Sequence, residues 1–252
     1  MQSPLVRMRT SFLNVLKLDP EDRLLIDYTL SLVVANYIKD TVDLVWGWIE
    51  GPSGSGKTEV IRTLKAWPLC VFKSELTPQS LASGTNTDDG EDPSLLRDLD
   101  GKILVFKDFT TQSGERDDKV AKIMSTLRGA WDGFYNKHSG SQGGREYTAK
   151  FGVISCITGV IDAFADENQQ LGERLLIFRV GKKYKNHSES ADKLLGILDS
   201  LGNKKQWRRE LTDITTNILN ETVDLGIDVS AEEREYSKAT FGETTGSALS
   251  GL

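Results

Sequence analysis

Short apolar runs alternate with stretches of helical period through the middle of the chain. Five runs are rich in β-branched or aromatic residues and are bounded by turn formers, so they predict buried strands: 44–49, 69–72, 103–106, 153–158 and 175–180. Helical patterns over 57–65 and 117–131 lie between some of these runs. Strands that alternate with helices are typical of a mostly parallel α/β sheet, which is the fold class that the pattern predicts.

The flanking segments differ from this pattern. Residues 1–18 have no clear period, whereas Asp19 and Pro20 are typical of a helix start and 24–38 is apolar on most faces, which predicts a buried helix. After Gly181 the chain is basic and then helical to about 225. We therefore expect four units: an N-terminal helical segment packed on the core (1–43), the core (44–181), a small helical C-terminal part (182–228) and a flexible tail rich in Ser, Thr and Gly (229–252).

Two segments inside the core lack a clear strand or helix pattern. Residues 74–100 are mostly polar and predict a loop with one short helix. The turn formers at 139–144 are flanked by aromatic and basic residues, which indicates a β-hairpin.

Composition narrows the class of protein. Apolar residues make up 38% of the chain and charged residues 27%, which is enough to bury a sizeable core. The 37 acidic and 31 basic residues give a net charge of −6, which excludes nucleic-acid binding through bulk positive charge but allows a local basic patch. Two cysteines suit a reducing compartment, and no apolar stretch reaches the roughly 18 residues of a membrane helix. We expect a soluble cytoplasmic protein with no membrane contact.

A phosphate-binding pattern follows the first predicted strand. The pattern G-x-x-x-x-G-K-S/T is matched by Gly51-Pro52-Ser53-Gly54-Ser55-Gly56-Lys57-Thr58. Glycines let the backbone wrap a phosphate, Lys57 is expected to reach the β- and γ-phosphates, and the Thr58 hydroxyl is expected to ligate Mg²⁺. The alternative is a Gly/Ser-rich surface loop, which the position between a predicted strand and a predicted helix disfavours. The segment therefore predicts binding of ATP and Mg²⁺.

Asp108 is the candidate for the second acidic group of such a site. It follows the predicted strand 103–106, and a P-loop enzyme holds Mg²⁺ or its water through a carboxylate at the end of a neighbouring strand. The alternative is that Asp108 only begins a turn. Lys107 precedes it and Phe109 follows it, so no adjacent Glu offers itself as the base for the attacking water, and Glu115, seven residues on, reaches only if the loop folds back. The catalytic base is therefore unassigned at this stage.

Two further residues have positions that suit the γ-phosphate. Thr158 ends a predicted strand, where its hydroxyl can orient water, or it is an ordinary residue at a strand end. Arg174 precedes the next apolar run, and an arginine supplied to a neighbour's γ-phosphate contributes roughly 10³–10⁵ in rate. The alternative for Arg174 is a surface salt bridge, for which Glu173 is the nearest partner in sequence.

Taken together, these motifs resemble a family of phage and mobile-element ATPases of AAA+ type. The resemblance covers about residues 20–215 and is carried by the phosphate-binding pattern and by Ser74-Glu75-Leu76-Thr77-Pro78, Ser83-Gly84, Lys107-Asp108-Phe109-Thr110, Asp132-Gly133, Gly143-Gly144-Arg145 and Leu171-Gly172-Glu173-Arg174. It implies a three-layer P-loop NTPase core with a parallel sheet. It also implies a homo-oligomer, such as a ring, in which Thr158 is a first sensor, Arg174 acts across the subunit boundary and Arg208 is the candidate second sensor.

The same resemblance suggests a contact with DNA. In helicase-like AAA+ rings a hairpin before the sensor strand points into the pore, and this implies that Lys137 and Lys150 grip the backbone of single-stranded or duplex DNA. Phe134, Tyr135 and Tyr147 lie between the basic residues and are candidates for stacking on bases. The alternative is a solvated hairpin whose aromatic residues pack on the sheet.

Three functions are therefore open. The first is an ATP-driven motor or remodeller that acts on DNA in phage or mobile-element replication. The second is a nucleotide-dependent switch or loader that hydrolyses slowly and acts on a protein partner, which the acidic net charge and the missing Glu favour. The third, a small-molecule kinase, fits less well because the run from Lys182 to Lys185 resembles a lid only in its charge.

Overall fold

A five-stranded parallel sheet forms the centre of the molecule. The computed structural model describes residues 4–16, 23–38, 44–74, 76–83, 85–87, 89–106, 116–139, 143–157, 175–180 and 203–224. The sheet has the order β2-β3-β6-β1-β7, and every pair of neighbours is parallel. Its strands are β1 (Trp46–Glu50), β2 (Cys70–Lys73), β3 (Ile103–Phe106), β6 (Gly152–Ile157) and β7 (Leu175–Arg179). The predicted α/β class with a parallel sheet is confirmed.

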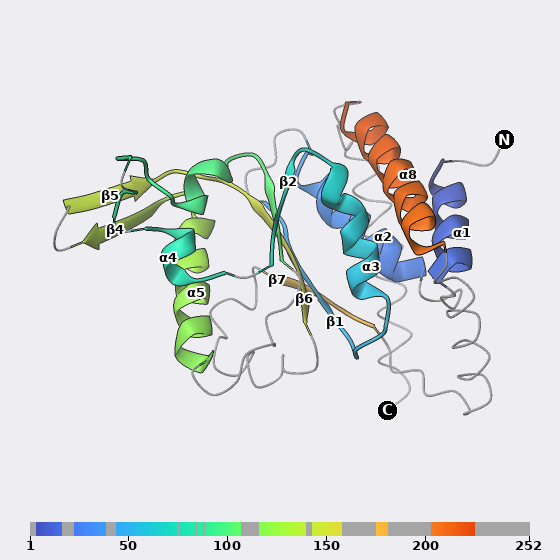
Figure 1. Cartoon of the computed structure of the whole chain (residues 1–252), viewed down its shortest axis with the longest axis horizontal. Coiled ribbons are helices and arrows are strands. Elements are labelled where there is room, and N and C mark those ends of the chain that lie inside the picture. The colour runs from blue at the N-terminus through green and yellow to red at the C-terminus, as the bar shows by residue number, and fades with distance from the viewer. Residues whose placement is uncertain are drawn as a thin grey trace, which may run out of the picture.

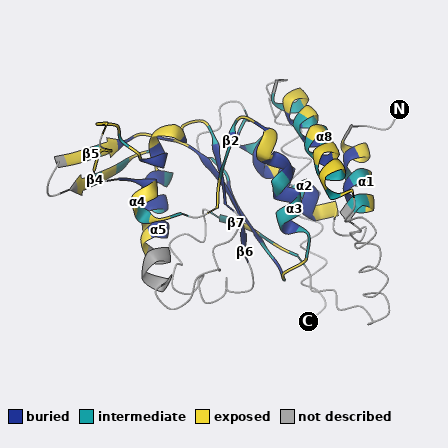
Figure 2. Ribbon diagram, viewed as in Figure 1, coloured by how far each residue is buried: buried dark blue, intermediate teal, exposed yellow. Residues whose placement is uncertain are grey.

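Both faces of the sheet are covered, as Figures 1 and 2 show. Every residue of β3 and β6 is buried, which is why these strands read as continuous apolar runs rather than as an alternating pattern. Gly47 of β1 shows how closely a helix approaches, because a Cβ at this position would lie 2.3 Å from Cδ1 of Leu32. A side chain at position 47 would therefore require Leu32 to move.

One face of the sheet carries helices from both ends of the described chain. These are α1 (Pro4–Leu16), α2 (Arg23–Ala35), α3 (Lys57–Arg62), the 3₁₀ helix η2 (Thr63–Ala66) and α8 (Lys204–Asp224). Met8 and Phe12 of α1 are buried in the same apolar cluster as Leu211 and Leu219 of α8. None of the described helices is long and apolar enough to cross a membrane.

The opposite face carries a second apolar cluster. It is covered by α4 (Pro78–Leu81), the 3₁₀ helix η3 (Leu95–Asp98) and α5 (Arg116–Trp131), next to the hairpin of β4 (Tyr135–Ser139) and β5 (Gly143–Tyr147). Trp46 anchors this layer to β1: its Nε1 donates to the Phe151 carbonyl at 2.7 Å, and its ring packs edge-on against Trp131. The short helices α4 and η3 and the hairpin agree with the sequence predictions for 74–100 and 139–144.

The observed elements differ from the predicted ones mainly at the N-terminus. Helix α1 was not predicted, although Met8, Phe12 and Val15 recur at helical spacing and form the face that packs on the core. The strand predicted to end at Thr158 ends at Ile157 in the structure, and Thr158 lies outside the described residues. The tail predicted over 229–252 also lies outside them.

We expect truncation of a core side chain on the sheet to reduce stability strongly. Leu104 of β3 is fully buried, so Leu104→Ala is expected to lower the free energy of unfolding by about 2–5 kcal/mol, measured by urea denaturation. The matched control is Leu176→Ala on β7, whose side chain is 54% exposed and whose truncation is expected to cost about 0.5 kcal/mol or less. Equal losses in the two variants would contradict the described packing.

Candidate functional site

The loop formed by residues 51–58 begins at the carboxyl end of β1, inside the sheet rather than at its edge. Its first residue is held by β6, because the Gly51 amide donates to the Ile157 carbonyl at 3.1 Å. On the other side the Val180 amide donates to the Glu50 carbonyl at 2.7 Å. A Cβ on Gly51 would lie 2.8 Å from Cβ of Val180, so the close approach of the chain after β7 requires glycine here.

Two further glycines shape the loop through their backbone conformation. Gly54 and Gly56 have φ values of 80° and 83°, in the left-handed region that favours glycine. A Cβ on Gly54 would meet nothing within 4 Å, so its conformation and not crowding selects the residue. A hydrogen bond from the Ser55 amide to the Pro52 carbonyl, at 3.3 Å, closes the turn. The loop therefore has the bent backbone that the sequence pattern predicts.

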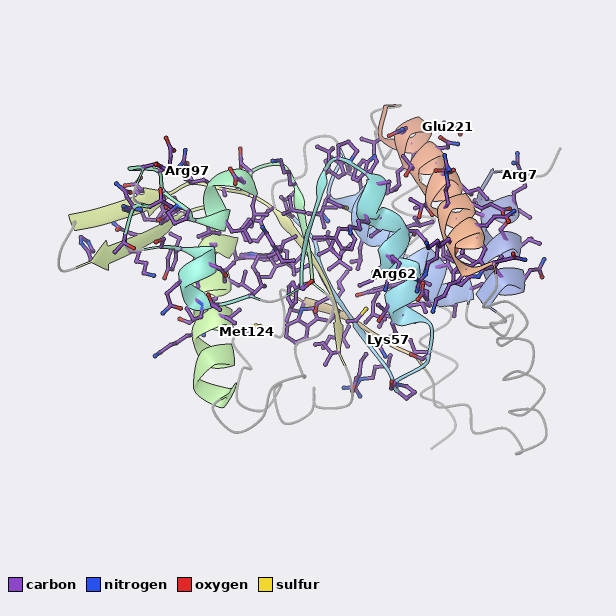
Figure 3. All side chains as sticks on the ribbon, viewed as in Figure 1. Arg7, Lys57, Arg62, Arg97, Met124 and Glu221 are labelled. Carbon is purple, nitrogen blue, oxygen red and sulfur yellow. The ribbon has the colours of Figure 1, made fainter. Side chains whose placement is uncertain are left out.

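Lys57 lies at the centre of the loop and is only 5% exposed (Figure 3). Its ammonium donates to the carbonyls of Gly51 and Pro52, at 2.5 and 2.8 Å, and to Oγ of Ser55 at 3.1 Å. A buried ammonium needs such acceptors, because an unpartnered charge away from water is costly. The loop thus holds a positive charge on its inner side, where an anion enclosed by the backbone would meet it.

Helix α3 begins directly at the loop. Gly56 is its N-cap, and the amides of Glu59 and Val60 donate to the Gly56 carbonyl. Thr58 lies in the first turn and is half-buried. Since α3 continues into η2 without a break, the loop is attached to ten residues of continuous helical backbone. A hydroxyl, a lysine and a helix start therefore come together within one turn of chain.

Arg208 of α8 lies against α3. Its Nε donates to Oε2 of Glu59 at 2.9 Å, and its Nη2 donates to Oε1 of the same carboxylate. Arg62 approaches this carboxylate as well, with its Nε 3.5 Å from Oε2. Glu59 follows Thr58 directly, so the C-terminal helix is joined to the first turn after the loop. The resemblance implies that Arg208 is the second sensor, and this role stays a prediction.

The carboxyl ends of β6, β1 and β7 lie side by side around the loop. Glu50, the last residue of β1, pairs in register with Ile157 of β6 and Arg179 of β7. Its Oε2 lies 2.9 Å from Nε of Arg179, and the two side chains are 14% and 58% exposed. The sequence analysis did not identify Glu50; the signal was a carboxylate directly before the phosphate-binding pattern.

Three predicted site residues, Asp108, Thr158 and Arg174, lie outside the described residues. The strands that precede Asp108 and Thr158 are described. These strands, β3 and β6, are parallel to β1, so their carboxyl ends lie at the same end of the sheet as the loop. Neighbouring strands are about 4.8 Å apart, so the end of β3 is about 10 Å from that of β1. The metal-ligand part of the prediction therefore stays a prediction, and within the described residues no three His, Cys, Asp or Glu side chains form a metal site.

The hairpin turns its basic side chains toward the body of the protein. Lys137 and Arg145 are cross-strand partners on one face. Nζ of Lys137 donates to the Ala82 carbonyl, and Nη1 of Arg145 lies 3.0 Å from Oδ1 of Asp92. Two like charges placed opposite each other destabilise a hairpin unless acceptors compensate them, and here both sit beside acceptors. The contact of Lys137 therefore attaches the hairpin to the segment that carries Ala82.

Two of the hairpin tyrosines also face inward. Tyr147 is buried, and its hydroxyl donates to the Ser83 carbonyl at 3.0 Å and lies 2.8 Å from Oγ of Ser94. Tyr135 packs against the same apolar cluster. For these two residues the packing alternative is the one observed. Phe134, which is 49% exposed, points outward.

Lys150 lies after the hairpin and is exposed. Its stem runs over Gly133, where a Cβ would come within 3.2 Å of Cε of Lys150. Its amide donates to Oδ1 of Asp100 at 2.9 Å. Of the two basic residues proposed to contact DNA, Lys150 is thus the more accessible.

The sequence matches no protein-family model, and no curated protein matches it significantly.

We expect the docking of the hairpin to depend on pH through Asp92. Burial by itself raises the pKa of Asp92, but hydrogen bonds from Ser94 and the charge of Arg145 outweigh it, so the pKa is lowered. A lowered pKa means that the charged form stabilises the folded state at neutral pH, and that this contribution is lost as the pH falls through the lowered pKa.

Asp92→Asn is therefore expected to lower the melting temperature at pH 7, and the difference from wild type is expected to shrink at acid pH. Asp98→Asn on η3, an exposed position, serves as the control. Circular dichroism melts between pH 3 and pH 7 measure both. A difference that stays constant across this range would contradict the role given to the Asp92 charge.

Proposed function

We propose that the protein is a P-loop NTPase of AAA+ type that binds ATP with Mg²⁺ and hydrolyses it. The observation that carries the proposal is the loop 51–58: a glycine-shaped turn at the carboxyl end of a central parallel strand, with a buried lysine inside it and a helix leaving from it. In open α/β sheets, ligands bind at this end of the strands.

Each loop residue has a part in the proposed binding. Amide groups of the bent backbone point at the phosphates, and the start of α3 favours their negative charge. Lys57 exchanges the carbonyls of Gly51 and Pro52 for phosphate oxygens, which satisfies the same ammonium with stronger, charged acceptors. Thr58 and Asp108 hold Mg²⁺, which neutralises the charge that develops during phosphoryl transfer.

The strand order supports the remaining assignments. Because β6 lies next to β1, the carboxyl end of β6 is next to the loop, and this supports the proposal that Thr158, which follows β6 in the sequence, senses the γ-phosphate. Arg174 directly precedes β7, whose amino end lies at the opposite edge of the sheet from the loop. Five residues of strand span about 16 Å, so an arginine entering β7 is poorly placed for the nucleotide of its own chain. This supports action on a neighbouring subunit and therefore a homo-oligomer such as a ring.

Hydrolysis is proposed to drive movement on single-stranded or duplex DNA in the replication of a phage or mobile element. The support is the resemblance of the motifs, together with the exposure of Lys150 and Phe134 beside the hairpin. A few exposed lysines per subunit, repeated around a ring, produce a local positive channel despite an acidic exterior.

A second candidate is a nucleotide-dependent switch or loader that acts on a protein partner. It is favoured by the outward face of the described hairpin, which carries Phe134, Asn136, His138 and Glu146 and within these described positions no Lys or Arg. Such a face suits a protein surface better than a phosphate backbone. Both candidates use the same nucleotide site.

Lys57→Ala is expected to weaken nucleotide binding by about 100-fold, since it removes a buried positive charge from the phosphates. Titration with a fluorescent ATP analogue measures the Kd. Lys65→Ala on η2 is the control, because Lys65 is exposed and follows the same loop. Binding to Lys57→Ala that equals binding to wild type would overturn the proposed site.

The two candidates differ in how hydrolysis responds to concentration and to DNA. For a ring with an arginine acting in trans, the rate of ATP hydrolysis per protein is expected to rise with protein concentration. For a DNA motor, this rate is expected to rise further when single-stranded DNA is added. Steady-state phosphate release across a dilution series, with and without DNA, measures both. A rate per protein that is low, independent of protein concentration and unchanged by DNA would favour the switch or loader.

A further inference from the structure

The edge of the sheet around the phosphate-binding loop contains one carboxylate at a strand end. Among the five strands of the described sheet, β1 ends in Glu50, whereas the others end in Lys73, Phe106, Ile157 and Arg179. Glu50 directly precedes Gly51, the first residue of the loop. The pattern of β1 is otherwise apolar, Trp-Gly-Trp-Ile, so an acidic residue here is not explained by the burial of the strand.

The side chain of Glu50 is confined. Trp46 and Trp48 belong to one apolar cluster and Ile49 belongs to the other. Because successive strand residues point to opposite faces, Glu50 points to the same face as the two tryptophans, which is the face opposite α3. It is 14% exposed, and its Oε2 lies 2.9 Å from Nε of Arg179. A carboxylate in such a position is costly to desolvate and is usually either paired for structure or held for chemistry.

The backbone that carries Glu50 is held from both sides. Its carbonyl accepts from the Val180 amide, and the next amide, that of Gly51, donates to the Ile157 carbonyl. The peptide unit between Glu50 and Gly51 therefore has a fixed place relative to the loop. A group attached to a rigid strand keeps its geometry better than one attached to a loop, which is what a catalytic group needs.

We infer that Glu50 is the general base for ATP hydrolysis and that Arg179 is its positioning residue. This inference rests on the proposed function, and it fills the gap left by the absence of a Glu beside Asp108 in the sequence. The carboxylate of Glu50 accepts a proton from water while the water oxygen forms a bond to the γ-phosphorus. The bond from the γ-phosphorus to the bridging oxygen breaks, and ADP leaves with its electron pair. Glu50 then releases the proton to solvent, so the products are ADP, inorganic phosphate and a proton.

Arg179 suits the part of a positioning residue. Its Nε lies 2.9 Å from Oε2 of the carboxylate, a charge contact without hydrogen-bond geometry, while the Arg179 side chain is 58% exposed at the end of β7. An exposed partner can shift without disturbing the core, whereas the register Glu50–Arg179 keeps it opposite the base.

The decisive variant is Glu50→Gln, which keeps the size of the side chain and removes its basicity. We expect the Kd for a fluorescent ATP analogue to stay within about twofold of wild type and kcat to fall about 10²- to 10⁴-fold, since that is the contribution of a general base. Glu210→Gln on α8 is the matched control, because Glu210 is exposed and distant in sequence from the loop. Melting temperatures of all variants verify folding.

If Glu50→Gln does not fold, Glu50→Asp decides the question. The shorter carboxylate is expected to bind the analogue normally and to lose at least about tenfold in kcat, because a general base must lie within hydrogen-bond reach of its proton. Arg179→Gln is expected to lower kcat about 10- to 100-fold with KM unchanged, and Arg179→Lys to restore part of it. An Arg179 variant with a lower melting temperature but an unchanged kcat would show that the contact with Glu50 serves only stability, and would overturn the positioning role of Arg179.

The outcomes separate the inference from the function on which it rests. Wild-type protein that neither binds the analogue nor releases phosphate overturns the proposed function. Wild-type protein that hydrolyses ATP, together with a folded Glu50→Gln variant at a similar kcat, overturns the inference alone. Selective loss of kcat in Glu50→Gln with intact binding supports both.

Discussion

The parallel pairing of β1 between β6 and β7 is the constraint on which the rest of the structure depends. It places the end of β1 inside the sheet, so the loop that follows leaves with a strand on each side. The hydrogen bonds at Gly51 and Val180 continue this pairing into the loop itself. Lys57 folds back onto the carbonyls of Gly51 and Pro52, directly after the residue whose carbonyl is bonded to the chain after β7. The same pairing brings Arg179 opposite Glu50.

Two apolar layers transmit this geometry to the remainder of the molecule. On one face, helices from both ends of the described chain pack together over α3, and the bidentate contact between Arg208 and Glu59 joins α8 to the first turn after the loop. Well-packed interiors do not deform continuously, so a displacement of α3 has to be accommodated by α8. The fold therefore couples the loop to the C-terminal helix through direct contact, with no separate domain between them among the described residues.

On the other face, a polar network fixes the hairpin. Tyr147, Ser94 and Asp92 form hydrogen bonds beneath β5, and Arg145 adds its charge. These contacts use the inward face of the hairpin, so its outward face decides what it recognises. That division of labour follows from the two-residue period of a strand, which sends alternate side chains to opposite sides.

The sequence by itself determined the strands, the glycine-shaped loop at 51–58 and the helix after it, because each depends on neighbouring residues: apolar runs of strand length, and glycines and a lysine at set spacing. Helix α1 escaped prediction although its apolar face, Met8, Phe12 and Val15, already has helical spacing in the sequence. The tertiary structure decided the strand order, and with it the contact of Glu50 with Arg179 and that of Glu59 with Arg208. It also decided which way Lys137 and Arg145 point. These relations join residues far apart in the chain, and only the packing of the sheet and its two layers brings them within bonding distance.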